Sequence, residues 1–170
     1  MIRTERLLLR PVVMADLSDF HDILRRPEAM LYWSTPPHPD LAATQAWMGT
    51  LVGQDPEMTL EFAVEYRGRV IGKVGGGALP EIGYIFHPDF WGQGFAHEAM
   101  VALIDHAFAN RSGDHLLADI DPRNLASRRL LAKLGFQFSH HANNTFCIAG
   151  LWVDSDYYVL PRPAGQKESI

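Results

Sequence analysis

The stretch FWGQGFAHEA, residues 90–99, decides how the rest of the chain is interpreted. Two glycines, Gly92 and Gly94, come directly before a segment in which apolar residues recur at helical spacing. Residues 81–86, EIGYIF, precede them and read as a short strand. A strand, a glycine-containing turn and a helix N-terminus present unpaired N–H groups that can bind phosphate oxygens. A plain turn that uses glycine for backbone freedom explains the same residues, so both interpretations stay open here.

The composition is that of an ordinary soluble domain. The chain has 170 residues, of which 47% are hydrophobic and 21% charged, and we expect a single domain at residues 1–160 with a loose tail at 161–170. A net charge of −5 argues against a nucleic-acid or anionic-membrane partner. One cysteine, Cys147, suits a reducing compartment, and no apolar stretch approaches the ~20 residues of a membrane span. We therefore expect a cytoplasmic protein.

Periodicity predicts alternating strands and helices along the whole chain. Strands are expected at residues 6–13, 60–66, 70–74, 81–86, 115–120, 136–140 and 151–160. Helices are expected at residues 14–26 and 42–52, from the glycine turn to near residue 110, and from about residue 124 to 134. Residues 31–40 are rich in proline and residues 142–145 are polar, so both are expected to be loops.

Residues 91–96, WGQGFA, resemble the pyrophosphate-binding loop of the GNAT superfamily of acyl-CoA transferases, whose usual pattern is Arg/Gln-x-x-Gly-x-Gly/Ala. Gly94 and Ala96 match this pattern. Trp91 replaces the leading Arg or Gln, as is typical of the branch that contains the ribosomal-protein N-terminal acetyltransferases. The resemblance extends from TERL at residues 4–7 to the last expected strand. It implies an α/β fold in which a central twisted mixed sheet of six to seven strands is flanked by about four helices.

The resemblance also implies roles for particular residues, with acetyl-CoA as the co-substrate and no metal. The loop residues expected to bind the CoA pyrophosphate are Trp91, Gly92, Gln93, Gly94, Phe95, Ala96 and His97. Asn124 and Ser127 match a pair that contacts the pantetheine arm, although Asn124 is also a good helix N-cap on its own. A backbone N–H at Ile85 or Phe86 is expected to polarise the acetyl carbonyl, and these residues would also border the cofactor.

The proton-transfer residues are less clear from the sequence. Leu131 stands where many members of the superfamily carry a tyrosine that protonates the leaving thiolate. Glu81 is the best candidate for a general base, with a surface carboxylate as the competing interpretation. At neutral pH the free-base form of a lysine amine costs about 4.6 kcal/mol and that of an α-amine about 1.4 kcal/mol. A chain without a strong base therefore favours an α-amine as the acceptor.

Other residues offer weaker signals. Tyr32 and Trp33, in the proline-rich segment, are expected to line the acceptor pocket or to pack in the core below it. His140 and His141 are adjacent on an expected strand and face opposite ways, which makes them a poor metal pair. Cys147 has no recognisable catalytic partner, so direct transfer without an acyl-enzyme is preferred.

The sequence thus predicts an N-acetyltransferase that moves the acetyl group of acetyl-CoA directly to a primary amine, with a protein N-terminal α-amine favoured. A small-molecule acceptor, such as a polyamine, an amino acid or an antibiotic, is the first alternative, and a non-catalytic CoA-binding module is the second. A homodimer is implied by the resemblance. A dinucleotide-binding fold is disfavoured, because the G-x-G-x-x-G pattern would need glycine at His97.

Overall fold

A computed structural model describes residues 1–54 and 59–164 of the protein, in two antiparallel sheets. The first sheet runs in order through β1 (Ile2–Arg3), β2 (Leu8–Arg10), β3 (Leu60–Tyr66), β4 (Arg69–Gly76) and β5 (Gly83–Phe86). The second contains β6 (His115–Ile120), β8 (Leu151–Pro161) and β7 (Gln137–Ile148), with β8 in the middle.

The helices are α1 (Leu17–Leu24), α2 (Pro27–Met30), α3 (Leu41–Gly49), α4 (Phe95–Asn110) and α5 (Leu125–Lys133). Two 3-10 turns, η1 (Met14–Asp16) and η2 (Pro88–Phe90), precede α1 and the glycine turn. The α/β fold predicted from the sequence is confirmed. The expected single sheet is divided in two, and none of the described helices is long and apolar enough to cross a membrane.

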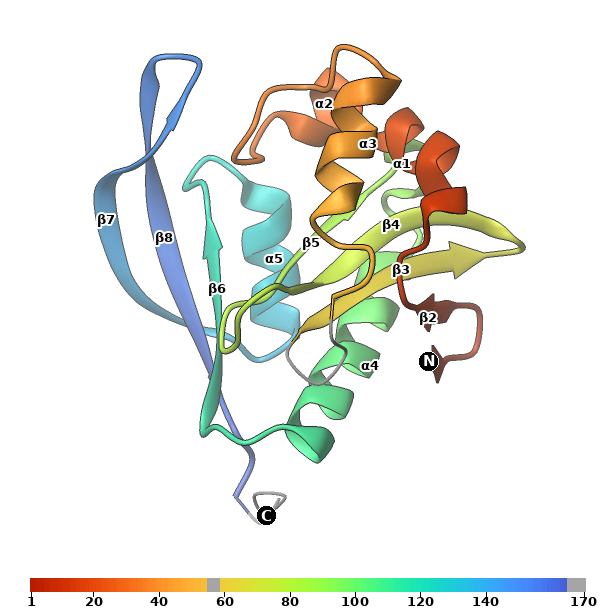
Figure 1. Cartoon of the computed structure of the whole chain (residues 1–170). Coiled ribbons are helices and arrows are strands. Elements are labelled where there is room, and N and C mark those ends of the chain that lie inside the picture. Colours follow the sequence, from red (N-terminus) through yellow and green to blue (C-terminus); the bar gives the residue numbers. More distant parts are fainter. Residues whose placement is uncertain (55–58, 165–170) are drawn as a thin grey trace.

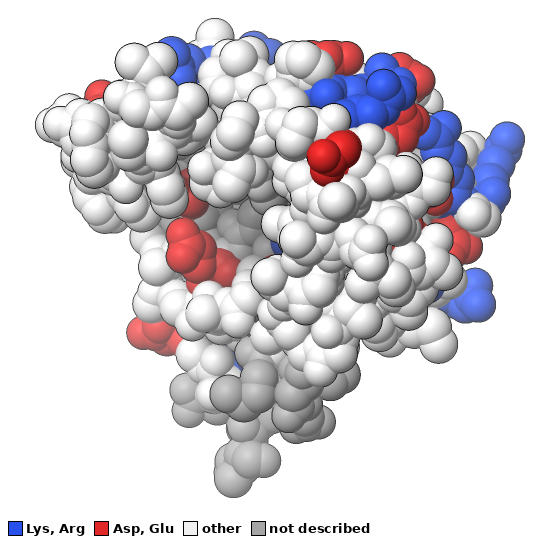
Figure 2. Space-filling model, turned by 45° about the horizontal axis from the view of Figure 1, so that its top comes forward, with Lys and Arg blue, Asp and Glu red and all other residues white. Residues whose placement is uncertain are grey.

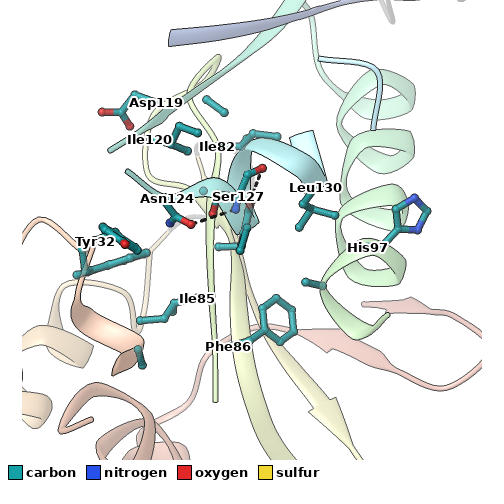
Figure 3. Close-up of a pocket in the computed structure, with 18 of the residues that line it drawn as sticks. Tyr32, Ile82, Ile85, Phe86, His97, Asp119, Ile120, Asn124, Ser127 and Leu130 are labelled. Atoms are coloured by element: carbon teal, nitrogen blue, oxygen red, sulfur yellow. Dashed lines mark hydrogen bonds between the residues drawn. The ribbon is translucent and has the colours of Figure 1, made fainter. Parts of the chain in front are cut away.

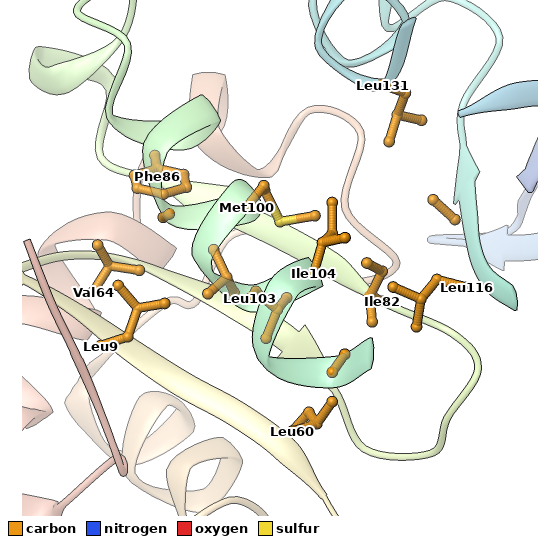
Figure 4. Packing of buried hydrophobic residues seen from close by; sticks show 14 of the residues in the cluster. Leu9, Leu60, Val64, Ile82, Phe86, Met100, Leu103, Ile104, Leu116 and Leu131 are labelled. Atoms are coloured by element: carbon orange, nitrogen blue, oxygen red, sulfur yellow. The ribbon is translucent and has the colours of Figure 1, made fainter. Parts of the chain in front are cut away.

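Helices cover both faces of the five-stranded sheet, with α1 and α3 on one face and α4 on the other (Figure 1). The alternation of side chains along β5 divides them between the two layers, because successive residues of a strand point to opposite faces. Phe86 packs under α4 with Met100 and Leu103 (Figure 4). Ile85 packs instead with the α1 and α3 cluster.

Among the residues that the structure describes, backbone hydrogen bonds join the two sheets only just before β5. Glu81 forms a parallel bridge with Leu117, the N–H of Ile82 donates to the carbonyl of Leu117 at 2.8 Å, and Leu117 donates to Pro80 at 2.8 Å. Beyond this point β5 and β6 are not paired, so they diverge and leave a gap between the two sheets.

The register of β5 on β4 decides which backbone groups face this gap. His87 donates to the carbonyl of Ile71 at 2.8 Å, and Ile85 and Phe86 lie opposite Lys73 and Gly72. Hydrogen-bonded and non-hydrogen-bonded pairs alternate in an antiparallel ladder. Because His87 and Ile71 form a hydrogen-bonded pair, Ile85 and Lys73, two residues away, do so as well, and the backbone N–H of Ile85 points toward β4. The N–H of Phe86 therefore points away from β4, toward the gap. Of the two residues expected to polarise the carbonyl, only Phe86 has this orientation.

Two expectations about the C-terminal part of the chain differ from the structure. Residues 142–145, expected as a loop, lie inside β7, where the pairing with β8 is irregular between Ala142 and Phe146. The reversal occurs instead at Ala149 and Gly150, whose φ angles of 49° and 84° form the hairpin turn. Strand β8 continues to Pro161, so the described start of the expected tail is ordered structure; residues 165–170 lie outside the described residues.

Candidate active site

A groove of about 1600 Å³ follows the gap between the sheets, from the first turn of α4 past β5 and α5 to the β7–β8 hairpin. It brings together all the predicted site residues except Gln93. Those that line it are Tyr32, Trp33, Glu81, Ile85, Phe86, Trp91, Gly92, Gly94, Phe95, Ala96, His97, Asn124 and Ser127. In Figure 3, Asn124 and Ser127 lie between Tyr32 on one side and Leu130 and His97 on the other.

The start of α4 provides the hydrogen-bond donors of one end of the groove. Gly94 is the N-cap with φ of 83°, and Gly92 has φ of 72°, conformations that favour glycine. Within the described part of the chain, no acceptor is found for the N–H groups of residues 92–97, and the first helical bond is from Glu98 to the Gly94 carbonyl at 3.0 Å. A run of unpartnered N–H groups at the positive end of a 16-residue helix can bind an anion.

Trp91, the residue that departs from the usual loop pattern, connects this turn to β5. Its indole Nε1–H donates to the carbonyl of Phe86 at 2.9 Å, and half of its surface is exposed. The buried His87 fixes the same connection, because its Nε2 lies 3.0 Å from Asp22 of α1 and its Nδ1 accepts from the N–H of Asp89 at 3.2 Å. These contacts hold the turn and the end of β5 in one fixed arrangement.

Arg6 belongs to the TERL stretch of the resemblance, but the sequence assigned it no role. It packs on the first turn of α4 from the segment between β1 and β2. Its Nε donates to Glu98 at 2.7 Å and its Nη1 donates to the carbonyl of Gln93 at 3.0 Å. Its guanidinium lies 4.3 Å from the centre of the Phe95 ring. Only the tertiary fold shows this contact, since about 90 residues separate the partners in sequence.

At the start of α5, Asn124 acts as the N-cap. Its side-chain oxygen accepts from the N–H of Ser127 at 3.0 Å, which confirms the capping interpretation. Its side-chain amide nitrogen has no hydrogen-bond partner among the described residues, and the residue lines the groove. The hydroxyl of Tyr84 on β5 donates to the carbonyl of Ser127 at 3.5 Å, and burial raises the pKa of Tyr84 to about 12. Tyr84 is therefore a protonated phenol beside the groove at neutral pH.

Leu131, at the position where the resemblance expects a tyrosine acid, is fully buried. It belongs to the same buried cluster as Ile104 and Leu116, to which it is contributed from α5, and is not among the residues that line the groove (Figure 4). This position of α5 supplies no proton donor to the groove.

Glu81 lies at the base of the gap and faces a second carboxyl, Asp119 of β6. Burial raises the pKa of Glu81, and the charge of Asp119 and a hydrogen bond to it raise that pKa further. Burial also raises the pKa of Asp119. The hydrogen bond that Asp119 accepts from the Ser155 hydroxyl at 3.2 Å lowers this pKa, but the effect of burial is larger. Sequence reasoning missed Asp119 and Ser155, because the pairing of β6 with β8 that brings them together is not a local pattern.

The far end of the groove has two walls from distant parts of the chain. Tyr32, 37% exposed, lies on one wall with Arg123 5.9 Å from its ring, whereas Trp33 packs partly against the core under α1 and α3. The opposite wall includes Phe146 and Val153 of the β7–β8 hairpin. Figure 2 shows this hollowed face with acidic side chains beside the hollow. An aromatic and acidic pocket of this kind suits an apolar group that carries a positive charge.

The remaining candidate residues lie elsewhere. His140 stacks on Tyr157 at a centroid distance of 4.6 Å, and His141 contacts Asp156 at 2.8 Å. Across residues 1–54 and 59–164, no three His, Cys, Asp or Glu side chains are grouped so as to hold a metal ion. Cys147 is exposed on β7 and does not line the groove.

Comparison with known proteins identifies the family. Residues 6–137 match the model of the acetyltransferase (GNAT) domain. An uncharacterised N-acetyltransferase, p20, from Bacillus licheniformis is 30% identical over 145 residues, which are 79% of this chain and 80% of that protein.

Two solved structures share the fold. A spermidine N-acetyltransferase from Vibrio cholerae, in complex with CoA and spermine, is 20% identical with a TM-score of 0.79, over 94% of this chain and 97% of that one. RimL, a ribosomal L7/L12 α-N-protein acetyltransferase in complex with coenzyme A, is 18% identical with a TM-score of 0.80, over 93% of this chain and 95% of that one. With the domain match over most of its length, the chain described here belongs to the GNAT family of acetyltransferases.

Proposed function

We propose that this GNAT acetyltransferase transfers the acetyl group of acetyl-CoA directly to a primary amine, with both substrates bound in the groove at once. The observation that carries the proposal is the order of groups along the groove. Unpartnered N–H groups lie at the start of α4, the N–H of Phe86 faces the gap, and the carboxyl of Glu81 lies at its base. These are an anion site, a carbonyl-polarising donor and a proton acceptor in one continuous space.

The thioester of acetyl-CoA supplies an activated acetyl group when bound. The N–H groups of residues 92–97 are suited to hold its diphosphate, and the free amide of Asn124 faces the path of the pantetheine arm. The N–H of Phe86 is aimed to donate to the acetyl oxygen as negative charge develops there. The amine nitrogen bonds to the carbonyl carbon, the carbon–sulfur bond breaks, and the sulfur leaves with the electron pair.

Glu81 is the residue proposed to accept the proton that the attacking amine loses, directly or through water. Its pKa is raised by burial and by Asp119, which makes its carboxylate a stronger base than that of an exposed glutamate. Tyr84 and Ser127, which both line the groove, carry hydroxyl groups at α5. Neither has to protonate the sulfur, because a thiol with a pKa near ~8.5 is a competent leaving group.

An α-amine at a protein N-terminus is the acceptor we favour. A carboxylate remains a weak base for lysine, whose free amine form costs about 4.6 kcal/mol at neutral pH, against about 1.4 kcal/mol for an α-amine. The structural neighbour RimL, described as acting on the α-amino group of a ribosomal protein, supports this choice.

A small polyvalent amine is the second candidate acceptor, and the carboxylates around the far end of the groove favour it. Asp121 and Asp154 line the groove in addition to Glu81 and Asp119 at the base of the gap, although Asp121 is already paired with Arg123 and Asp154 lies 3.6 Å from His141. The neighbour crystallised with spermine has the same fold.

The experiment is an acceptor screen that measures CoA thiol release from acetyl-CoA. The panel contains peptides with a free α-amine, the same peptides with a blocked N-terminus and an internal lysine, and polyamines. Release with the first group alone supports the favoured acceptor, and release with polyamines alone supports the second. Tight acetyl-CoA binding without release on any amine would instead indicate a non-catalytic CoA-binding module.

A separate binding experiment tests the proposed phosphate site at the start of α4. Gly94→Val places a β-branched residue at φ of 83° and is expected to weaken acetyl-CoA binding by about tenfold or more, roughly 1.4 kcal/mol, while the far-ultraviolet circular dichroism is unchanged. Unchanged affinity in isothermal titration calorimetry would remove the phosphate assignment. Gly113→Val, in the turn after α4 and away from the groove, provides the control for positive φ.

A further inference from the structure

Arg6 reaches the start of α4 from the N-terminal segment and is held there by several contacts. Its backbone N–H donates to Glu98 Oε1 at 2.8 Å, its Nε donates to Glu98 Oε2 at 2.7 Å, and its Nη1 donates to the Gln93 carbonyl at 3.0 Å. The guanidinium also lies over the ring of Phe95 at 4.3 Å. These contacts give the side chain one position although 38% of it is exposed.

The remaining guanidinium nitrogen, Nη2, has no acceptor among the described residues. It lies 3.4 Å from the place that a Cβ on Gly94 would take, and Arg6 lines the groove. The free donor of Arg6 is thus next to the residue at which the unpartnered N–H groups of α4 begin. A guanidinium with one open side suits a phosphate oxygen, since phosphate accepts several short charge-assisted hydrogen bonds.

The charge balance at this end of the groove gives Arg6 a second role. Glu98 also lines the groove, one turn into α4. Burial acts to raise its pKa, but hydrogen bonds from Thr4 and Arg6 outweigh burial and lower it, so the carboxyl is ionised at neutral pH. An uncompensated carboxylate there would repel a diphosphate, and the cation that cancels it is Arg6. Trp91, in the loop itself, brings an indole and no charge.

We propose that Arg6 is a phosphate-binding residue of the acetyl-CoA site, which donates from Nη2 to the diphosphate and neutralises Glu98. This inference rests on the proposed function, because it requires acetyl-CoA to bind in the groove. The loop pattern around Gly94 is local, whereas this cation comes from a segment that precedes it by almost 90 residues.

The test compares the two partners of the same ion pair. Isothermal titration calorimetry with acetyl-CoA is performed on the wild type, Arg6→Met, Glu98→Gln and the double variant. Arg6→Met is expected to weaken binding by about 10- to 100-fold, the range of one lost charge-assisted hydrogen bond. Glu98→Gln is expected to keep or improve the affinity, and the double variant to recover part of the loss. Arg25→Met, an exposed arginine paired with Asp22 on α1, is the matched control and is expected to bind normally.

A second ligand separates phosphate binding from support of the loop. Acetylpantetheine keeps the thioester and lacks the diphosphate, so its dissociation constant from an NMR titration is expected to be the same for wild type and Arg6→Met. Arg6→Lys keeps the charge and loses the planar fork, and is expected to bind acetyl-CoA with intermediate affinity. If Arg6→Met does not fold, this variant and the double variant decide the question.

The outcomes are distinguishable. Equal losses for Arg6→Met and Glu98→Gln, with both ligands, would show that the ion pair only supports the loop and would overturn the inference while the proposed function stands. Normal acetyl-CoA affinity of Arg6→Met would overturn it as well. A wild type that binds no acetyl-CoA would overturn the proposed function and this inference together.

Discussion

At the scale of single residues, glycine sets where two groups of the groove lie. A Cβ on Gly72 would come within 2.6 Å of the Ile85 carbonyl oxygen and of the Phe86 ring. A Cβ on Gly76 would overlap the carbonyl oxygen of Glu81. Any other residue at these positions would displace the end or the start of β5. Because Gly72 and Gly76 have no side chains, β4 can approach closely enough for Phe86, the proposed carbonyl-polarising residue, and Glu81, the proposed base, to take their positions.

The raised pKa of Glu81 leads to a prediction about the pH dependence of the reaction. A base must be ionised to act, so kcat/KM is expected to fall as the pH drops through the pKa of Glu81, which lies above the ordinary glutamate value of ~4.3. Glu81→Gln is expected to abolish this acidic limb and to lower kcat by about 10²- to 10⁴-fold. Steady-state rates of the wild type and of Glu81→Gln, measured between about pH 5 and about pH 9, provide the test.

The control for this pH profile is Asp114→Asn, because Asp114 is exposed and lies outside the groove lining. That variant is expected to keep the wild-type limb and rate. An unchanged pH–rate profile for Glu81→Gln would mean that a group other than Glu81 accepts the proton of the amine.

The residues of the candidate site could be predicted where the signal is local. The two glycines before an apolar helix, and an asparagine after Asp-Pro-Arg, are patterns of a few residues that indicate a helix N-terminus. Asp119 and Ser155 carry no such signal, and Arg6 lies in the TERL stretch of the resemblance without a pattern that assigns it a role. Their positions depend on how β2 pairs with β3 and β6 with β8, which connects residues far apart in the chain.

At the scale of elements, α4 is held at both ends by other parts of the chain. Arg6 contacts its first turn, and Arg162, directly after β8, contacts its last. The guanidinium of Arg162 donates to the carbonyls of Phe108, of Arg111 at 2.6 Å and of Gly113 at 2.7 Å. A cation that satisfies the last carbonyls of a helix stabilises its negative end.

Replacing Arg162 is therefore expected to reduce stability without affecting the groove. Arg162→Met loses these hydrogen bonds and should lower the free energy of unfolding by about 1.5–3 kcal/mol, as judged from urea denaturation. Acetyl-CoA affinity should stay at the wild-type value, since Arg162 does not line the groove. Arg67→Met, at the exposed β3–β4 turn, serves as the control, and equal stability of the two variants would refute the capping role.

The β7–β8 hairpin shows why elements at an exposed edge are hard to predict. Nearly all of β7 is exposed, so no apolar alternation distinguishes its residues 142–145 from a loop. The turn lies at Ala149 and Gly150, and Ala149 gives no local indication of its positive φ. In contrast, α4 and β3 to β5 border the two cores, and their burial imposes the periodicity from which they were predicted.

At the scale of the whole molecule, the divergence of the two sheets makes the groove. Strand β5 belongs to one sheet and β6 to the other. The two strands are bridged at Glu81 and Leu117 and separate from that point on. The groove continues from the start of α4, through this gap, to the space between Tyr32 and the β7–β8 hairpin. The two ends of the groove are built from different parts of the chain.

This continuity predicts the kinetic order of the reaction. If both substrates occupy one groove and the acetyl group passes directly between them, double-reciprocal plots of initial rate should intersect as the amine concentration is varied. Cys147→Ser should keep kcat within about twofold, because this exposed thiol does not line the groove and no acyl-enzyme is required. Parallel lines, or acetylated protein detected by mass spectrometry after incubation with acetyl-CoA alone, would instead require a covalent intermediate. The carboxyls of Glu81 and Asp119, which line the groove at the base of the gap, would then be the first nucleophiles to test by substitution.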